Sequence, residues 1–374
     1  MATVLWGALV ALGGVLLLLV LQGIYLGAVL RWQDERTVGL AYYGLPPAGR
    51  AAFKRALRRH ARLLAPLLWL NARTTRLDFR RLTFQYKGVP GPHGTTSPES
   101  FARGEAYEPR PGDVFVATQM KCGTTWMQHL VYELLHRGGG NLVESGTPLY
   151  AVSPWLEGRK SVSLAEAPSL GAERPSRVIK THFPADLCPR SPEARYIYVV
   201  RHPVSCFASC MDFIITNVGG LAPGVGVFEE WFCSPELMWW GTWPGHVRGW
   251  WARSRRDGNV LVVSFEEMKR DLPGVARRVA GFLGLAPLGE PELARVVEKC
   301  SFAYMQRHQD SFEMHPPHLL QTNAELFVRG TADRHRDVPG EVRERLLAWS
   351  ARGLEGSDFP LSAFYPEVAG ARGR

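Results

Sequence analysis

Residues 121–126, Lys-Cys-Gly-Thr-Thr-Trp, combine a cation, a glycine and two hydroxyl side chains. An apolar, strand-like run at 114–118 precedes them, and a helical pattern follows over 126–135. A strand, a tight turn with glycine and a helix can hold phosphate, because backbone N–H groups of the turn and of the helix N-terminus face the anion. The nucleoside-triphosphate motif G-x-x-x-x-G-K-[ST] is absent, since this lysine precedes the glycine. The stretch predicts a phosphate loop of another kind, with an ordinary strand–turn–helix as the alternative.

Two more polar side chains lie near the end of a second apolar run, residues 177–184. Lys180 and His182 are two positions apart, so both project from the same face of a strand. Catalytic groups collect at the carboxyl ends of parallel strands in α/β folds. This position makes the pair candidate catalytic groups. A strand-end lysine beside a structural histidine is the alternative.

A third candidate follows the strongest β pattern in the chain, residues 194–200. Arg201 comes directly after this run, and Ser209 lies two turns into the helix that the sequence predicts next. An arginine can hold a phosphate through two parallel hydrogen bonds, which a lysine cannot. Arg201 is therefore a candidate phosphate ligand, unless it only closes the strand with a salt bridge.

Taken in order, these segments resemble the sulfotransferases that use 3′-phosphoadenosine 5′-phosphosulfate (PAPS). The loop at 121–126 resembles the family's 5′-phosphosulfate loop, Lys-Thr-His at 180–182 its second signature, and Arg201 with Ser209 its 3′-phosphate site. The similarity extends from about residue 86 to about residue 347, with four motifs in the family's order. It implies an α/β, P-loop-like three-layer fold with a central parallel sheet flanked by helices. It also implies a PAPS-dependent sulfotransferase of the EC 2.8.2 type.

The resemblance assigns a role to each polar residue at the strand ends. His182 would be the general base that takes the proton from an acceptor hydroxyl or amine. Lys121 would stabilise the bridging oxygen as the 5′-phosphate leaves, and Lys180 would neutralise charge on the sulfuryl oxygens. The resemblance implies no metal.

PAPS contacts are expected well beyond the loop. Cys300-Ser301-Phe302 with Met305 matches the family's T-S-F-x-x-M pattern, whose Phe packs on adenine, and Phe265 stands where the family usually has Tyr. Residues 327–330 resemble its R-K-G turn at the 3′-phosphate, although the first two basic residues of that turn do not both appear. For Trp126 a buried structural role is the alternative. The expected PAPS contacts are Lys121, Cys122, Gly123, Thr124, Thr125, Trp126, Arg201, Ser209, Phe265, Cys300, Phe302, Arg329 and Gly330.

The chain also departs from the family's pattern. Gln119 and Met120 stand where Tyr-Pro is usual, and Cys122 stands where Ser is common. The family's C-terminal dimer motif is not recognisable after Arg336, which leaves the oligomeric state open. The six cysteines show neither a C-x-x-C pair nor metal-ligand spacing, so we expect free thiols.

The N-terminal residues 3–30 contain no charged side chain. As a helix they span roughly 42 Å, enough to cross a hydrocarbon core of about 30 Å. A cleaved signal peptide, the alternative, would have a basic start and a shorter apolar core. We therefore predict a single-pass membrane anchor over residues 1–31. Because basic residues follow the span and none precedes it, the positive-inside rule places the catalytic domain in the cytoplasm.

The net charge of +9 is concentrated in residues 50–81, which hold ten lysines and arginines against one acid, Asp78. Phe53, Leu57, Ala61 and Leu64 recur there at helical spacing. This pattern suits a helix lying on an anionic membrane surface, with a solvated helix packed on the domain as the alternative. We expect a basic juxtamembrane segment over 32–82, a sulfotransferase domain over 83–368, and no nucleic-acid partner.

The acceptor is suggested by an aromatic segment, residues 211–251. In the family this region helps to shape the acceptor pocket, so aromatic lining beside a membrane anchor predicts a small lipophilic alcohol, a phenol or a membrane lipid. Core packing explains some of these rings equally well, and a glycan acceptor is the alternative. The rings are Trp231, Phe232, Trp239, Trp240, Trp243, Trp250 and Trp251.

Two other function classes share the strand–loop–helix. A P-loop kinase should carry its lysine after the glycine and an aspartate for magnesium, and the order of residues in this loop argues against it. A non-catalytic membrane scaffold that kept only the nucleotide fold would be free to lose Lys121, Lys180 and His182, yet all three are present.

Overall fold

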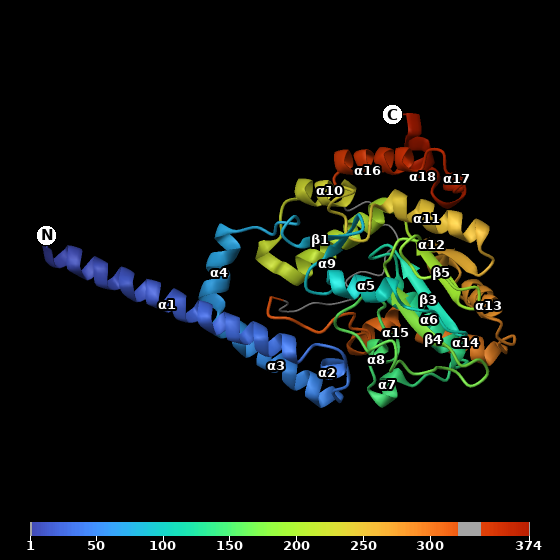
Figure 1. The fold of residues 1–374 in the computed structure, drawn as a ribbon, viewed down its shortest axis with the longest axis horizontal. Coiled ribbons are helices and arrows are strands. Elements are labelled where there is room, and N and C mark those ends of the chain that lie inside the picture. Colours follow the sequence, from blue (N-terminus) through green and yellow to red (C-terminus); the bar gives the residue numbers. More distant parts are fainter. Residues whose placement is uncertain (1, 321–337, 374) are drawn as a thin grey trace.

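The computed structural model describes residues 2–320 and 338–373. Figure 1 shows helices on both faces of one sheet and a long N-terminal helix that projects away from this domain. The sheet consists of four parallel strands in the spatial order β4-β3-β5-β6. They are β3 (Asp113–Thr118), β4 (Arg177–Thr181), β5 (Arg195–Val200) and β6 (Val260–Ser264). The predicted central parallel sheet is confirmed.

Side chains on these strands point alternately to the two faces of the sheet, where they pack into two separate hydrophobic cores. Phe115 and Tyr196 stack on one face with ring centroids 4.9 Å apart, whereas Val114, Val116 and Ile197 point into the core on the other face. Strands covered on both faces are almost continuously apolar, which explains why the sequence showed unbroken apolar runs. The three layers of the predicted fold follow from this alternation.

Each core is covered by its own helices. The first core is covered by α9 (Pro203–Val218), α10 (Val225–Cys233), α11 (Trp243–Arg256) and α16 (Gly340–Gly353). The second is covered by α3 (Pro47–Leu63), α6 (Thr124–Leu135), α13 (Leu272–Leu283) and α14 (Glu290–Lys299). The shorter helices are α2 (Leu40–Tyr43), α5 (Pro98–Glu105), α7 (Leu142–Ser145), α8 (Leu149–Val152), α12 (Phe265–Arg270), α15 (Phe302–Arg307), α17 (Leu361–Phe364) and α18 (Pro366–Ala369). A hairpin of β1 (Thr83–Tyr86) and β2 (Val89–Pro92) and the 3-10 turns η1 (Gly219–Leu221), η2 (Gln309–Ser311) and η4 (Gly370–Gly373) complete the described elements.

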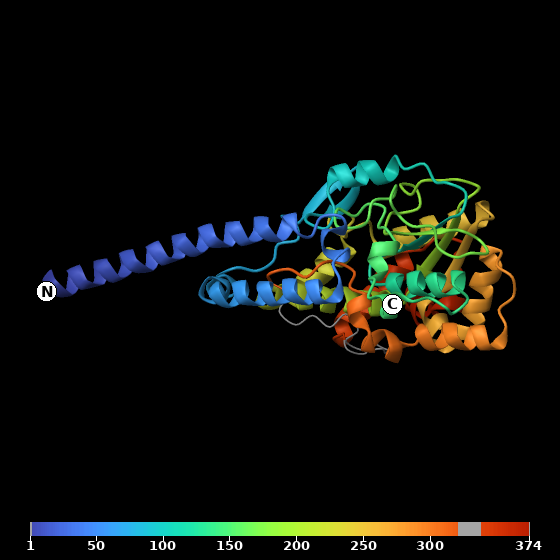
Figure 2. The same cartoon turned by 90° about the horizontal axis from the view of Figure 1, so that it is seen from below.

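The N-terminal helix α1 (Ala2–Glu35) leaves the domain as a single rod (Figures 1 and 2). The segment Val4–Glu35 is long and apolar enough to cross a membrane. Its most apolar 18-residue stretch has a mean hydropathy of 2.7, and none of that stretch is buried within the described structure. Near its end, Val29 packs with Leu64 and Leu319. The segment Pro203–Leu221 is also long and apolar, but half of it is buried, as in a core helix.

The basic helix α3 packs on the domain. Phe53 and Leu57 are buried in the second core, and the Phe53 ring stacks on Trp32 of α1 at 5.1 Å. Its apolar face around Phe53 and Leu57 is therefore covered by protein, as in the packed-helix alternative, and its arginine-rich face meets solvent. The next helix, α4 (Ala65–Thr74), has no buried residue.

Candidate active site

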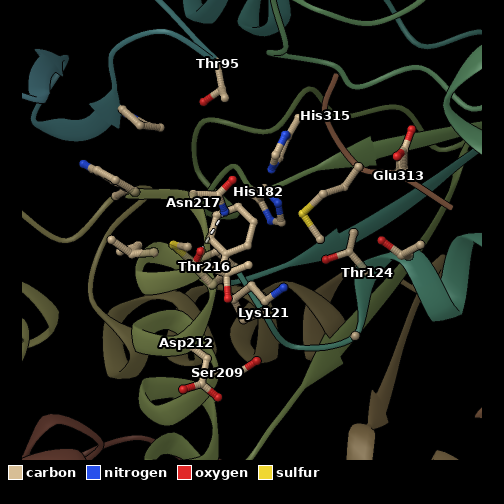
Figure 3. Close-up of a pocket in the computed structure, with 18 of the residues that line it drawn as sticks. Thr95, Lys121, Thr124, His182, Ser209, Asp212, Thr216, Asn217, Glu313 and His315 are labelled. Atoms are coloured by element: carbon tan, nitrogen blue, oxygen red, sulfur yellow. Dashed lines mark hydrogen bonds between the residues drawn. The ribbon is translucent and has the colours of Figure 1, made fainter. Parts of the chain in front are cut away.

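A cavity of about 390 Å³ lies beyond the carboxyl ends of the strands. Figure 3 shows Lys121, Thr124, His182 and Ser209 around this space, with His315 on the opposite side. Ten of the sequence-predicted residues line it: Lys121, Gly123, Thr124, Thr125, Trp126, Lys180, Arg201, Ser209, Phe265 and Phe302, together with His182 as the predicted base. Five chain segments far apart in the sequence thus meet where α/β folds bind their ligands.

The loop after β3 has the backbone of an anion site. Gly123 has φ of 100° and immediately precedes α6, whose N-terminus carries no side-chain cap. A Cβ at this position would lie 2.8 Å from Cδ2 of Phe265, so both the conformation and the space require glycine. The first N–H groups of α6 have no partner within the helix, and the helix dipole favours an anion beside them. The loop therefore fits the 5′-phosphate of PAPS.

His182 is held in one tautomer by the end of β3. Its Nδ1 lies 2.9 Å from the carbonyl oxygen of Thr118. Because a carbonyl only accepts, Nδ1 carries the proton and Nε2 keeps its lone pair. The backbone N–H of His182 donates to Oε1 of Glu157 at 2.7 Å. Burial, reinforced by the charge of Lys180, holds the pKa of His182 well below its ordinary value, so the ring is neutral and able to accept a proton.

Lys180 is buried against aromatic rings. Its ammonium lies 3.8 Å from the centroid of the Trp155 ring and 5.1 Å from that of Tyr150. Burial lowers the pKa of Lys180 to about 7, against the attraction of the Glu157 carboxyl. The Lys121 ammonium, which also lines the cavity, lies 4.6 Å from the ring centroid of Phe213. Two cations and a neutral imidazole therefore face one space.

Arg201 is arranged to accept a second anion. One terminal nitrogen, Nη1, donates to the carbonyl oxygen of Lys121 at 2.9 Å, and the guanidinium lies 4.3 Å from the ring centroid of Phe265. The buried Nε has no hydrogen-bond partner within the described ranges. A buried donor without a partner is costly, so this nitrogen fits a site for an anionic ligand. Ser209, also on the cavity wall, lies on α9 after Arg201.

The predicted adenine contacts form an aromatic corner. The Trp126 ring lies edge-on to Phe265 at 5.5 Å, and its Nε1 donates to the carbonyl oxygen of Cys300 at 2.8 Å. Phe302 begins α15, whose first turn is capped by the hydroxyl of Ser301. Trp126 thus makes a structural hydrogen bond and also lines the cavity. Its position is compatible with both interpretations, a PAPS contact and a structural residue.

Two predicted contacts are placed differently, and two others are not described. Cys122 points into the first core, with its Sγ 3.6 Å from that of Cys206, so only its backbone belongs to the loop. Cys300 is buried in the second core and takes part through its carbonyl oxygen. Arg329 and Gly330 lie outside the described residues. All six cysteines are free thiols, as expected.

Several residues that line the cavity belong to none of the sequence motifs. Trp155 comes from the loop before β4, and the segment with Glu313, His315 and His318 forms another part of the wall. Trp240 was noted only as one of many aromatic residues, yet its ring centroid lies 4.8 Å from that of His182. Its φ of 62° is unusual for a bulky side chain, and its N–H donates to the carbonyl oxygen of Pro90 at 2.7 Å. Trp231, Trp243 and Trp250 are buried in the first core as Trp240 is, but they are not among the residues that line the cavity.

Comparison with known proteins identifies the family of this chain. The family model described as "Sulfotransferase domain" matches residues 111–350. Sulfotransferase 2B1 of Homo sapiens is 31% identical over 66% of this chain and 67% of its own length. The 3-alpha-hydroxysteroid sulfotransferase of Cavia porcellus is 28% identical over 65% of this chain and 84% of its own length.

Solved structures share the fold. Retinol dehydratase in a complex with retinol and PAP superposes with a TM-score of 0.58, at 21% identity, over 76% of this chain and 97% of that one. Mouse sulfotransferase SULT7A1 complexed with PAP gives a TM-score of 0.55 at 21% identity, over 74% and 96% of the two chains. The chain therefore belongs to the family of PAPS-dependent sulfotransferases that its motifs resemble.

Proposed function

We propose that this protein transfers a sulfuryl group from PAPS to the hydroxyl of a lipophilic acceptor at a membrane, with His182 as the general base. The observation that carries this proposal is the tautomer of His182. Nδ1–H donates a hydrogen bond to the Thr118 carbonyl, which leaves Nε2 as the basic nitrogen of a cavity-lining ring. An amine acceptor would meet the same base.

PAPS supplies the activated sulfuryl group when it is bound. The loop at Gly123 and the N-terminus of α6 hold its 5′-phosphate, while Arg201 and Ser209 hold its 3′-phosphate. The adenine lies in the corner of Trp126, Phe265 and Phe302. These assignments are supported by the uncapped helix end and by the unpartnered Nε of Arg201.

The protein's own groups then act on the acceptor. His182 Nε2 takes the hydroxyl proton as the oxygen attacks, a contribution of typically about 10²–10⁴-fold. Lys121 stabilises the oxygen that departs with the 5′-phosphate, and Lys180 offsets charge on the sulfuryl oxygens. The attack forms an S–O bond to the acceptor oxygen and breaks the S–O bond to the 5′-phosphate. The oxidation state of sulfur does not change, so no redox partner is needed.

The acceptor half of the cavity supports a lipophilic molecule rather than a glycan. Its wall is mainly apolar and aromatic, and a glycan would need a denser set of hydrogen-bonding groups. Two similar proteins are named for a hydroxysteroid and for retinol, both lipophilic alcohols. The apolar residues of this wall include Leu77, Leu82, Met120, Phe213, Ile214, Val218, Trp239 and Trp240.

Membrane attachment is proposed from α1. This helix is uncovered over its apolar length, and basic residues follow it, so we infer a single-pass anchor with the catalytic domain in the cytoplasm. The anchor would hold the cavity close to lipophilic acceptors that are dissolved in the bilayer.

The proposed reaction is tested with radiolabelled PAPS and a 3-hydroxysteroid, using the full chain in detergent. Sulfated steroid should form, and His182→Ala should lower kcat by about 10² or more while leaving PAP affinity nearly unchanged. A fully active His182→Ala enzyme would show that another group or water is the base. Transfer to glycans but not to the steroid would support the alternative acceptor.

A further inference from the structure

The helix α4 presents an apolar surface that no part of the described chain covers. None of its residues is buried, and the exposed fractions of Leu63 just before it, and of Trp69 and Leu70 within it, are 62%, 58% and 38%. Isolated exposed apolar residues are ordinary, but a cluster of large ones on a single short helix marks an interaction surface.

The position of α4 indicates which partner covers this surface. In Figure 1 α4 runs across α1, close to where α1 leaves the domain, and the two helices are in contact. The uncovered apolar part of α1, from Val4 to Ile24, extends away from this crossing. If α1 crosses a bilayer, α4 must lie along the bilayer surface, with its apolar side chains continuous with those of the span.

The charges around α4 fit the headgroup layer of a bilayer. The Arg73 guanidinium lies 4.4 Å from the ring centroid of Trp69, which combines a cation with the aromatic residue that favours membrane interfaces. Further exposed arginines lie on α3 and after α4, and none of them lies within ion-pair distance of a carboxylate of the described chain. They are Arg55, Arg58, Arg59, Arg62 and Arg76. Anionic phospholipids would neutralise such a group.

The same surface adjoins one end of the cavity. Leu77, three residues after α4, lines the cavity and donates its N–H to the carbonyl oxygen of Leu221 in η1 at 2.8 Å. Val218, directly before η1, also lines the cavity. A Cβ on Gly220 of η1 would lie 3.0 Å from Cβ of Ala72 in α4, so helix and turn touch. The junction of α4 and η1 therefore adjoins both the cavity wall and the proposed lipid surface.

We propose that α4 and η1 dock on the surface of an anionic phospholipid bilayer, and that the lipophilic acceptor passes from the lipid into the cavity at their junction, between Leu77 and Val218. This inference rests on the proposed membrane anchor and lipophilic acceptor, and it adds the route between them. Trp69 and Leu70 enter the interfacial region, so the entrance opens at the depth where amphipathic alcohols present their hydroxyl groups.

Docking is tested by measuring depth in the full chain, reconstituted in vesicles of phosphatidylcholine and phosphatidylserine. Leu70→Cys carries a nitroxide label, in a Cys233→Ser background because Cys233 is the one cysteine that is not fully buried. Leu40→Cys is the matched control: Leu40 is also 38% exposed but lies at the far end of α1, on α2. The label at 70 should be relaxed by oxygen and shielded from a water-soluble nickel complex, and the label at 40 should show the reverse. Two equally aqueous labels would overturn the docking.

The entry route is tested by kinetics of Leu70→Glu and Leu40→Glu. Leu70→Glu should raise KM for a 3-hydroxysteroid dissolved in the vesicles by at least about fivefold, because a charge lifts α4 from the lipid. It should leave kcat/KM for water-soluble 4-nitrophenol within about twofold, and Leu40→Glu should change neither. An unchanged KM for the steroid, or an equal loss with both acceptors, would overturn the entry route. If the unmodified chain sulfates neither acceptor, the proposed reaction fails, whereas the depth measurement still decides the docking.

Discussion

Lys180 and Trp155 are paired across a parallel β-bridge, and the Lys180 ammonium lies 3.8 Å from the centroid of the Trp155 ring. The backbone supports the same arrangement, since the N–H of Leu156 donates to the carbonyl oxygen of Lys180 at 2.8 Å. The loop before β4 thereby places an aromatic wall beside a buried cation. Both His182 and Trp240 touch this wall, with ring centroids 5.6 and 5.9 Å from that of Trp155.

The first prediction concerns pH. Burial lowers the pKa of Lys180 to about 7, so its charge is present below that pH and is lost as the pH rises through it. Since the charged form offsets the sulfuryl oxygens, kcat/KM for PAPS should fall as the pH rises above about 7. Lys180→Arg keeps a charge throughout, so its profile should stay flat over this range, even where its absolute rate is lower. A pH–rate profile from about pH 5 to 10 decides this, and a wild-type profile that is flat to pH 10 would contradict the role of Lys180.

The second prediction concerns Arg201 and the nucleotide's 3′-phosphate. The protein should bind adenosine 3′,5′-bisphosphate far better than AMP, because we propose that Arg201 and Ser209 hold the additional phosphate. Arg201→Ala should weaken binding of the bisphosphate by about 2–5 kcal/mol, since truncation leaves a phosphate charge poorly paired. Binding of AMP should change little. Calorimetric titration of both nucleotides provides the measurement, and affinities within about a factor of two for the unmodified protein would refute the assignment.

A third prediction separates backbone strain from crowding in the phosphate loop. Gly123→Ala places a side chain at φ of 100° and 2.8 Å from the Phe265 ring, whereas Gly88→Ala has φ of 78° with no atom within 4 Å. Both should lose about 1–3 kcal/mol of stability through strain. Only Gly123→Ala should also lower PAP affinity, by about tenfold or more, because the loop must shift away from Phe265. Denaturant unfolding and PAP titration of the two variants measure these effects, and normal PAP affinity in Gly123→Ala would argue against the loop as a phosphate site.

The fourth prediction concerns topology. With α1 as an anchor and the basic residues on its C-terminal side, the catalytic domain should face the cytoplasm. Protease added to sealed cells should leave the domain intact, and permeabilised cells should show its digestion. Cleavage in sealed cells would place the domain outside and would favour exported glycans as acceptors.

The sequence alone was sufficient for the sheet and for naming most residues of the proposed donor site. The four strands are apolar runs because both faces of the sheet are covered, and each run is local information. The loop at Gly123 and the ends of β4 and β5 are also local, since a turn, a helix start and a strand end each need particular residues at fixed spacing. His182, Lys180 and Arg201 could therefore be named from the sequence, and the structure brings them to one cavity.

The tertiary structure alone decided what surrounds these groups. Trp155, Trp240 and His315 reach the cavity from separate segments. A local sequence pattern cannot predict contacts between residues so distant in the chain. The same applies to Cys122, which turns toward Cys206 in the core, and to α3, whose amphipathic pattern suits a membrane and a protein surface equally well. Periodicity predicts that a helix has an apolar face, but only packing determines what covers it. In this chain the domain covers α3 and leaves α4 exposed, because α3 meets the second core and α4 lies beyond its edge.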